Sequence, residues 1–313
     1  MIRASASAKI ILVGEHAVVY GVPAIAIPLA DIRAVASVIP GEPGAGLHIA
    51  AEDLAQVLPV DVNADLVDNA LAYTARLVLK KLNFPPPDIT ITIQSQIPMA
   101  SGLGSGAAVS TAVARALCTA IGVELSSADL NAIIYEVEKA HHGTPSGIDN
   151  TVIVYEQPVY FVREQPIRTL TVGSSFDFLI ADTGKGALTK IAVGDVRTLY
   201  DRDRARTQVI LDAIRSLVTS AKIALETGDL SLLGGLMTRN HNLLRELTVS
   251  SPELDTLVTA ALNAGAAGAK LSGGGRGGNM IALVTPYTNT AVRSELIKAG
   301  AVRVISTTLK ATT

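Results

Sequence analysis

Apolar positions in the first half of the chain follow both strand-like and helix-like spacing. Apolar residues three and four positions apart predict a helix over residues 64–82, which ends before the sequence Phe-Pro-Pro-Pro. Similar spacing predicts helices over residues 105–121 and 126–143; the second has a Ser/Asp capping pattern and stops at Gly143. Short apolar runs and alternations predict strands at residues 10–13, 24–29, 33–39, 47–50 and 89–95.

The pattern continues with strand-like runs at residues 151–156 and 158–164 and loosens around residues 163–172. Strands and helices interleave without a regular βαβ rhythm, so the predicted fold class is α+β, with two domains at residues 1–165 and 166–313. The second domain is expected to contain, in order, a strand at 176–181, three helical stretches between 190 and 264, a glycine loop and apolar run at 270–284, a helix, and a last strand at 301–309.

Composition narrows the class of protein. The chain has 313 residues, of which 49% are hydrophobic and 4% aromatic, so aliphatic side chains must supply the core. A net charge of −2 with 17% charged residues gives no basic face for nucleic acid and no polybasic membrane signal. A single cysteine, Cys118, excludes a disulfide framework. We find no secretory apolar region and no run of the ~18 residues that a membrane span needs, and therefore expect a cytoplasmic small-molecule protein.

The sequence SGLGSGAA, at residues 101–108, places Gly102, Gly104 and Gly106 at alternate positions before a helix of small residues. It is neither a Walker A loop nor a Rossmann fingerprint. Backbone N–H groups at a helix start, with the positive end of the helix dipole behind them, nevertheless form an anion site. The segment favours phosphate binding, and the alternative is a strand–helix turn whose glycines only permit close packing.

Several polar residues stand beside predicted apolar elements. Lys9 begins a strand, Glu15 and His16 follow it, and Glu138 lies on a helix. Taken singly, Lys9 is typical of a solvated strand-end charge, Glu15 and His16 of ordinary turn residues, and Glu138 of a solvated helix face. Asp149 lies in the turn-rich PSGIDN segment between apolar runs. An acid held there could serve as a general base or as a metal partner.

Four segments carry a resemblance to a known family. They are KIILVGEHAVVYG, PMASGLGSGAA, EKAHHGTPSGIDN and KLSGGGRGGNM, in that order along the chain. Together they resemble the GHMP kinase superfamily, and GEHAVVYG with HGTPSGIDN resembles its mevalonate kinase branch. The segment at residues 237–258 is similar to the family's second-domain helical segment, so the resemblance spans most of the chain.

The resemblance implies a two-domain GHMP kinase-like fold, with an N-terminal ATP-binding domain and the active site in the inter-domain cleft. The implied reaction moves the γ-phosphoryl of ATP to the primary hydroxyl of mevalonate, with Mg²⁺ present, in isoprenoid precursor synthesis; a homodimer is compatible with the family. The implied contacts to the ATP phosphates are Pro98, Ala100, Ser101, Gly102, Leu103, Gly104, Ser105, Gly106, Ala107 and Ala108.

The same resemblance assigns roles to single residues. Asp149 would accept the hydroxyl proton, and Lys9, near it, would stabilise the developing charge and keep the carboxylate ionised. Glu138 would bind Mg²⁺. Glu15 and His16 would contact the substrate, His16 through the mevalonate carboxylate or a hydroxyl.

The chain departs from the family pattern at three places. Gly106 stands where the family's Gly-Leu-Gly-Ser-Ser has a second serine that contacts magnesium, so the metal would take its oxygens from Glu138, phosphates, water and Ser105. The sequence before Lys9 lacks the Pro-Gly that relatives often have. Arg276 and Asn279 stand where the family tends towards Gly and Cys, and the sequence favours a solvated Arg276 over a phosphate contact.

Other functions compete with this reading. A superfamily kinase could act on another mevalonate hydroxyl, on phosphomevalonate, on homoserine or on a sugar, although GEHAVVYG argues against sugar kinases. A relative without catalytic activity could bind nucleotide or metabolites as a sensor. The presence together of Lys9, Glu138 and Asp149 argues against that second class.

Overall fold

The computed structural model describes residues 2–51, 56–61, 64, 69–98, 101–142, 145–187 and 189–312, with the backbone alone for residues 56 and 142. The chain divides into two compact units. Unit 1 comprises Met1–Ala8, Ile32–Met99 and Gly104–Glu156, and unit 2 comprises Lys9–Asp31, Ala100–Leu103 and Gln157–Thr313. The long strands β1 (Ile2–Val13) and β2 (Ala24–Pro40) contribute residues to both units.

Unit 1 is built on a sheet in which the strand order is β4-β3-β5-β2, and β1 also pairs with β2. Its other strands are β3 (Leu47–Ala51), β4 (Gln56–Pro59) and β5 (Ile89–Ser95). β3 runs parallel to β5, and β2 runs antiparallel to β5 with Ala34 opposite Ser95. The strands predicted at residues 10–13, 24–29, 33–39, 47–50 and 89–95 are confirmed, the second and third as parts of the single strand β2, whereas β4 was not predicted.

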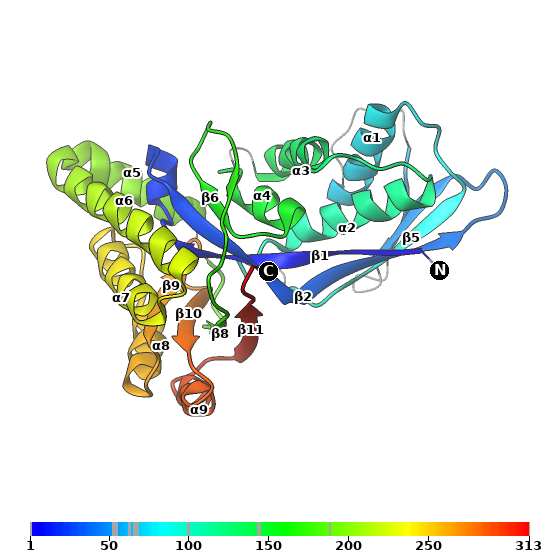
Figure 1. Ribbon diagram of the computed structural model, residues 1–313. Coiled ribbons are helices and arrows are strands. Elements are labelled where there is room, and N and C mark those ends of the chain that lie inside the picture. Colours follow the sequence, from blue (N-terminus) through cyan, green and yellow to red (C-terminus); the bar gives the residue numbers. More distant parts are fainter. Residues whose placement is uncertain are drawn as a thin grey trace. The chain divides into compact units, whose positions relative to one another are not determined.

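Four helices lie on one face of this sheet (Figure 1). They are α1 (Ala70–Leu82), α2 (Ser105–Ala120), α3 (Ser127–His142) and α4 (Ile148–Tyr155). The Asn69 side chain caps α1 by accepting from the N–H of Leu71 at 2.8 Å. The buried face of α2 consists largely of alanine, which lets neighbouring helices approach closely. The expected end of α3 at Gly143 and part of the helix predicted from residue 64 fall outside the described residues.

The strand predicted at residues 151–156 is wrong, because this run belongs to α4. The β-branched residues Thr151, Val152, Ile153 and Val154 favour a strand locally but are buried on a short helix. The hydroxyl of Thr151 donates to the Gly147 carbonyl at 2.6 Å, a local bond that fits the helical backbone. Asp149 therefore lies in the first turn of a helix and not in a loop.

Unit 2 contains a four-stranded antiparallel sheet with the order β11-β8-β10-β9. Its strands are β8 (Phe176–Asp182), β9 (Gly268–Ser272), β10 (Asn279–Val284) and β11 (Arg303–Leu309). β10, a central strand with a largely apolar sequence, is buried along its whole length. β9 lies at the edge of the sheet but is also buried, because the helices α7 (Leu230–Glu246) and α8 (Pro252–Asn263) pack against it. In the same unit, residues 24–26 of β2 pair with β6 (Val159–Phe161), and β6 pairs with β7 (Arg168–Thr169).

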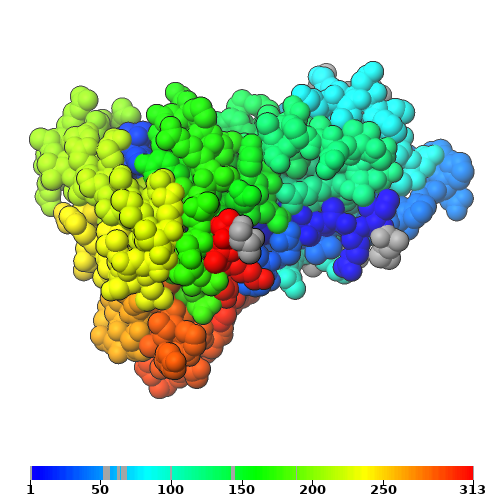
Figure 2. Space-filling model, in the orientation of Figure 1, coloured from blue at the N-terminus to red at the C-terminus, as the bar shows by residue number. Residues whose placement is uncertain are grey.

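The helices of unit 2 are η1 (Ala17–Tyr20), α5 (Thr189–Arg202), α6 (Arg204–Thr227), α7 (Leu230–Glu246), α8 (Pro252–Asn263) and α9 (Asn289–Lys298). Helices α5 to α8 are four where the sequence predicted three, because Asp203 separates and caps a pattern that looked continuous. Figure 2 shows α6, in yellow-green and yellow, on the surface, where Val209 and Ile223 are exposed. None of the helices in the described part of the chain combines the length and apolar character of a membrane span. The α+β prediction is confirmed.

Candidate active site

The turn after β1 packs so closely against Pro23 and Ala24 that no side chain can be accommodated at Gly14. A Cβ there would lie 2.6 Å from the Cα of Ala24 and from the carbonyl oxygen of Pro23, and φ is +99°. The Gly14 N–H donates to the side-chain oxygen of Asn240, on α7, at 3.2 Å. Glycine is therefore required at this position, and Asn240 fixes the backbone that presents Glu15 and His16.

Glu15 forms a buried ion pair with Lys270 of β9. The two side chains are 1% and 0% exposed, and the Lys270 ammonium also donates to the Leu271 carbonyl. Burial raises the pKa of Glu15 and lowers the pKa of Lys270, and each charge counteracts the shift of its partner. No sequence motif singled out Lys270, although a lysine inside an apolar strand is itself a signal of a buried partner.

His16 is held in one tautomer by its contact with the second glycine cluster, residues 273–278. Its Nε2 lies 3.1 Å from the Gly274 carbonyl, which can only accept, so Nε2 carries the proton. Burial is the main cause that lowers the pKa of His16 to about 4, with smaller contributions from Lys270 and Arg276. The ring is therefore neutral at pH 7, and its Nδ1 is an acceptor that has no hydrogen-bond partner among the described residues.

A second histidine supports β9 from α7. The Leu271 N–H donates to Nδ1 of His241 at 3.3 Å, and Nε2 of His241 lies 3.1 Å from Asp255 of α8. Burial lowers the pKa of His241 to about 4. This neutral imidazole bridges β9 and α8 next to the Glu15–Lys270 pair, and the sequence offered no pattern that identified it.

The first glycine loop, residues 101–108, uses left-handed backbone conformations that glycine adopts easily. Gly102 and Gly104 both have φ of +77°, and Gly104 is the N-cap residue of α2. Leu103 accepts from the backbone N–H of Lys9 at 3.1 Å, and the Asn279 side chain donates to the Ser101 carbonyl at 2.5 Å. These bonds fix the loop in unit 2, while Ser105, Gly106, Ala107 and Ala108 form the first turn of α2 in unit 1. Ala100 lies outside the described residues.

Glu138 lies beside this first turn. A Cβ built on Gly106 would be 3.4 Å from the carboxylate oxygen Oε1 of Glu138, so α3 presents its carboxylate to the start of α2. Glu138 is 9% exposed. No cluster of three or more His, Cys, Asp or Glu ligands occurs within the described ranges. One buried carboxylate beside the N-terminal turn of a helix is a donor set compatible with Mg²⁺, which uses one or two carboxylates together with phosphates and water.

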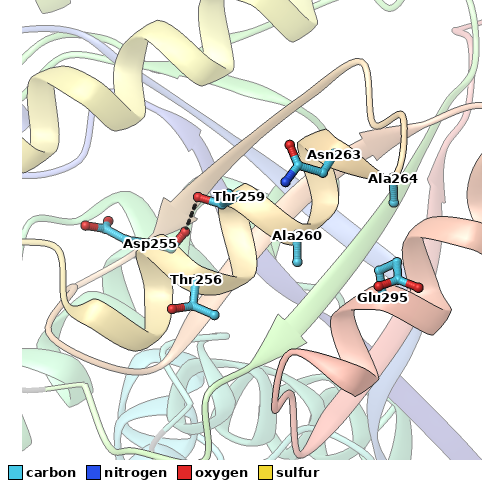
Figure 3. A pocket seen from close by; sticks show the side chains of 7 residues that line it. All are labelled: Asp255, Thr256, Thr259, Ala260, Asn263, Ala264 and Glu295. Atoms are coloured by element: carbon cyan, nitrogen blue, oxygen red, sulfur yellow. Dashed lines mark hydrogen bonds between the residues drawn. The ribbon is translucent and has the colours of Figure 1, made fainter.

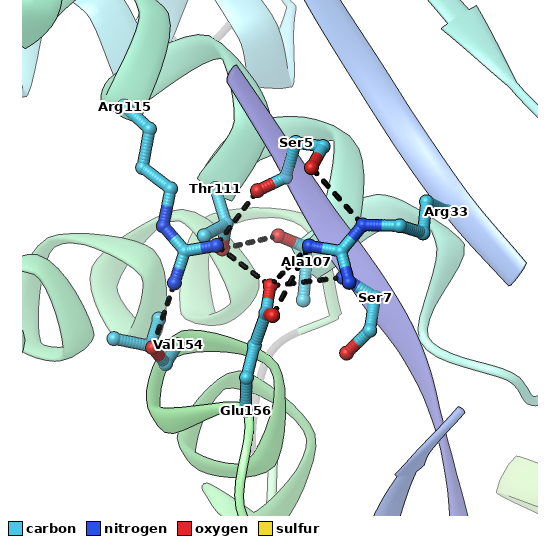
Figure 4. A network of polar contacts seen from close by, with 8 residues as sticks. All are labelled: Ser5, Ser7, Arg33, Ala107, Thr111, Arg115, Val154 and Glu156. Carbon is cyan, nitrogen blue, oxygen red and sulfur yellow. Dashed lines mark hydrogen bonds and ion pairs between the residues drawn. The ribbon is translucent and has the colours of Figure 1, made fainter. Parts of the chain in front are cut away.

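Asp149 is half-buried in the first turn of α4, and both ends of this helix are anchored. Near the start of α4, the Asn150 side chain donates to Asn131 of α3 at 2.7 Å. At the end, Figure 4 shows Glu156 accepting from two arginines. The Arg33–Glu156 and Arg115–Glu156 distances are both 2.8 Å. Anchored in this way, α4 holds the Asp149 backbone rigidly within unit 1.

Lys9, Glu15 and His16 are all buried, so Lys9 is not the solvated strand-end charge that it suggests when taken singly, while Glu15 and His16 do lie in a turn. Unit 2 brings them together with Ser101–Leu103, and unit 1 carries Glu138, Asp149 and the first turn of α2. The proximity of Lys9 to Asp149 stays a prediction.

The groove of about 590 Å³ between α8 and α9 (Figure 3) contains none of the candidate residues. Its lining residues are Asp255, Thr256, Thr259, Ala260, Asn263, Ala264 and Glu295.

Arg276 binds acceptors within the protein, which the sequence did not indicate. Its guanidinium pairs with Asp195 of α5, and its Nε and Nη2 each donate to the Thr248 carbonyl at 3.2 Å. The side chain is therefore bound to protein acceptors.

Comparisons with known proteins agree over nearly the full chain. Residues 69–157 match the family described as GHMP kinases N terminal domain, and residues 221–302 match GHMP kinases C terminal. A mevalonate kinase of Pyrococcus horikoshii is 34% identical over 97% of this chain and 95% of its own length. A mevalonate kinase of Aeropyrum pernix is 36% identical over 90% of this chain and 88% of its own length.

Solved structures give the same result. The Methanococcus jannaschii mevalonate kinase superposes with a TM-score of 0.87 at 26% identity, covering 99% of this chain and 98% of that one. The L. major mevalonate kinase, solved in complex with R-mevalonate, gives a TM-score of 0.85 at 28% identity and covers 99% and 96% of the two chains. The fold and the resemblance predicted from the sequence are thus confirmed: the chain belongs to the GHMP kinase family, among the mevalonate kinases.

Proposed function

We propose that this chain transfers the γ-phosphoryl group of ATP to the primary hydroxyl of mevalonate and forms 5-phosphomevalonate. The observation that carries the proposal is the match to curated mevalonate kinases at 34% identity over 97% of the chain. The buried polar groups described above supply the chemistry that this transfer needs. Phosphoryl transfer depends on positioning and charge neutralisation more than on covalent chemistry.

Asp149 is the base in this proposal. As the primary hydroxyl attacks the γ-phosphorus, the Asp149 carboxylate accepts its proton, and the bond to the bridging oxygen of ADP breaks. Lys9 compensates the negative charge on the attacking oxygen and on the phosphoryl group. The anchoring of α4 by Asn131 and Glu156 supports the Asp149 role, because a general base acts only from a fixed position.

The phosphates of ATP bind at the first glycine loop. Positive φ at Gly102 and Gly104 exposes the backbone of this loop, and the N–H groups at the start of α2 point towards the bound anion. Glu138 and Ser105 hold Mg²⁺, which neutralises phosphate charge when it is bound. Because Gly106 has no hydroxyl, Glu138 carries most of the protein's contribution to the metal site.

His16 contacts a hydroxyl of mevalonate and not its carboxylate. A neutral ring with the proton on Nε2 leaves Nδ1 with a lone pair, which accepts from a hydroxyl and repels a carboxylate. Of the two contacts that the sequence left open, the tautomer supports the hydroxyl.

The proposal is tested by coupled ADP release with mevalonate, phosphomevalonate, homoserine and galactose as acceptors. We expect turnover with mevalonate to exceed that with every other acceptor. Preferential turnover of another acceptor would assign the chain to a different kinase activity, and release from none would favour a binding protein. A cytoplasmic location and a homodimer belong to the same proposal, and light scattering after size exclusion tests the dimer.

A further inference from the structure

Arg276 occupies a backbone conformation that L-residues rarely adopt. It lies in the second glycine cluster, residues 273–278, with φ of +56°. Its guanidinium contacts Thr248, which also has a positive φ, +63°, in the turn between α7 and α8. Such conformations cost free energy and persist where the surroundings determine them strongly. Two of them joined by one side chain indicate a constrained junction.

The Arg276 side chain links three elements of unit 2. It pairs with Asp195 in the middle of α5, donates twice to Thr248, and its backbone N–H donates to the Val249 carbonyl at 2.9 Å. The planar fork of arginine serves both acceptors at once, which a lysine cannot do. α5 depends on such a link, because its buried residues are only Ala192 and Val196.

The glycines around Arg276 show how tightly the loop is held. A Cβ on Gly274 would lie 1.9 Å from the Thr189 hydroxyl, at the start of α5, and a Cβ on Gly275 would lie 2.0 Å from the Val249 carbonyl. The loop backbone thus fits between the same two elements that Arg276 ties together. The Gly274 carbonyl, in turn, is the acceptor that sets the tautomer of His16.

We propose that Arg276 is a positioning residue: by tying the loop at 273–278 to Asp195 and Thr248, it holds the Gly274 carbonyl against His16 and so presents His16 Nδ1 as the acceptor for a substrate hydroxyl. The contact between His16 and the substrate rests on the proposed function. The chain of contacts from Arg276 to His16 does not.

The test combines spectroscopy with kinetics on Arg276→Met, Arg276→Lys and Asp195→Asn. Long-range ¹H–¹⁵N correlation reports the tautomer of each of the five histidines, and a His16→Gln variant assigns the His16 signals. We expect the Nε2–H form in the parent and a mixture in all three variants. The KM for mevalonate should rise about 3- to 10-fold, the equivalent of one weakened hydrogen bond, while the KM for ATP changes less than about 2-fold.

Asp201→Asn is the matched control, because Asp201 also pairs with an arginine on α5, at 3.1 Å from Arg197, without contacting the glycine cluster. It should behave as the parent does. Unchanged His16 tautomers in Arg276→Met and Asp195→Asn would overturn the proposal. A rise confined to the KM for ATP would make Arg276 a phosphate ligand, and full recovery in Arg276→Lys would show that its charge alone matters. If mevalonate is not a substrate, the tautomer result still decides the positioning role.

Discussion

Replacing Lys270 with methionine tests how much the buried Glu15–Lys270 ion pair contributes to the stability of the protein. Lys270 and Glu15 are 0% and 1% exposed, so the substitution leaves a carboxylate in a protein interior without its counter-charge. Removing one partner of a buried pair costs about 3–5 kcal/mol, because the remaining charge has lost both water and partner. Since total stabilities are about 5–15 kcal/mol, we expect a large fall in the urea midpoint.

The assay is urea denaturation at pH 7 of the parent, Lys270→Met, Glu15→Gln and the double variant. The double variant removes both charges, so it should be more stable than the sum of the single losses predicts, by at least about 2 kcal/mol. Lys185→Met is the control: its pair with Glu253 is exposed, and its loss should leave the urea midpoint close to that of the parent. A loss of less than about 1 kcal/mol in Lys270→Met, or strictly additive losses, would show that Glu15 and Lys270 are not a coupled buried pair.

Three further predictions address catalysis, metal and pH. Asp149→Asn should lower turnover by roughly 10²- to 10⁴-fold with little change in the KM for ATP, and near-normal turnover would remove Asp149 from the mechanism. In magnesium titrations, Glu138→Gln should raise the Mg²⁺ concentration needed for half-maximal rate, and an unchanged titration would contradict the metal role of Glu138. Gly106→Ser should be tolerated, because residue 106 lies in the first turn of α2 and does not have a positive φ. Burial lowers the pKa of His16 and of His241 from 6.5 to about 4. The unfolded chain therefore binds more protons in this window, and stability is lost as the pH falls from 6.5 towards 4, by up to roughly 3 kcal/mol for a fully buried ring. Denaturation curves across this range check the slope, which should be smaller in His241→Gln, and equal slopes would contradict the assignment.

The sequence predicts the elements whose patterns are local and fails where tertiary packing decides. The strand β5 alternates Ile with Thr, and the alternating glycines lead directly into α2, as the sequence predicts. The run at residues 151–156 has strand propensity but forms the end and C-cap of α4, because contacts of this segment with α3, Arg33 and Arg115 select the helix. Local propensity contains no information about those distant partners.

The candidate site shows the same division. Motif spacing identified Glu15, but not that Lys270, 255 positions away, neutralises it. Arg276 could be interpreted only as solvated or phosphate-bound, since its acceptors, Asp195 and Thr248, lie on elements that the sequence does not place beside it. Pairings between distant segments are a property of the folded chain.

Phosphorus NMR of the product formed from ATP and mevalonate decides whether the chain phosphorylates the primary hydroxyl. A phosphate on the primary oxygen has two methylene protons three bonds from phosphorus, and the proton-coupled signal should be a triplet. A phosphate on the tertiary oxygen has no proton at that distance, and its signal would be a singlet. Phosphorylation of the primary hydroxyl predicts a triplet in a product that accumulates in proportion to ADP. A singlet, or ADP release without a new phosphoester signal, would contradict this assignment.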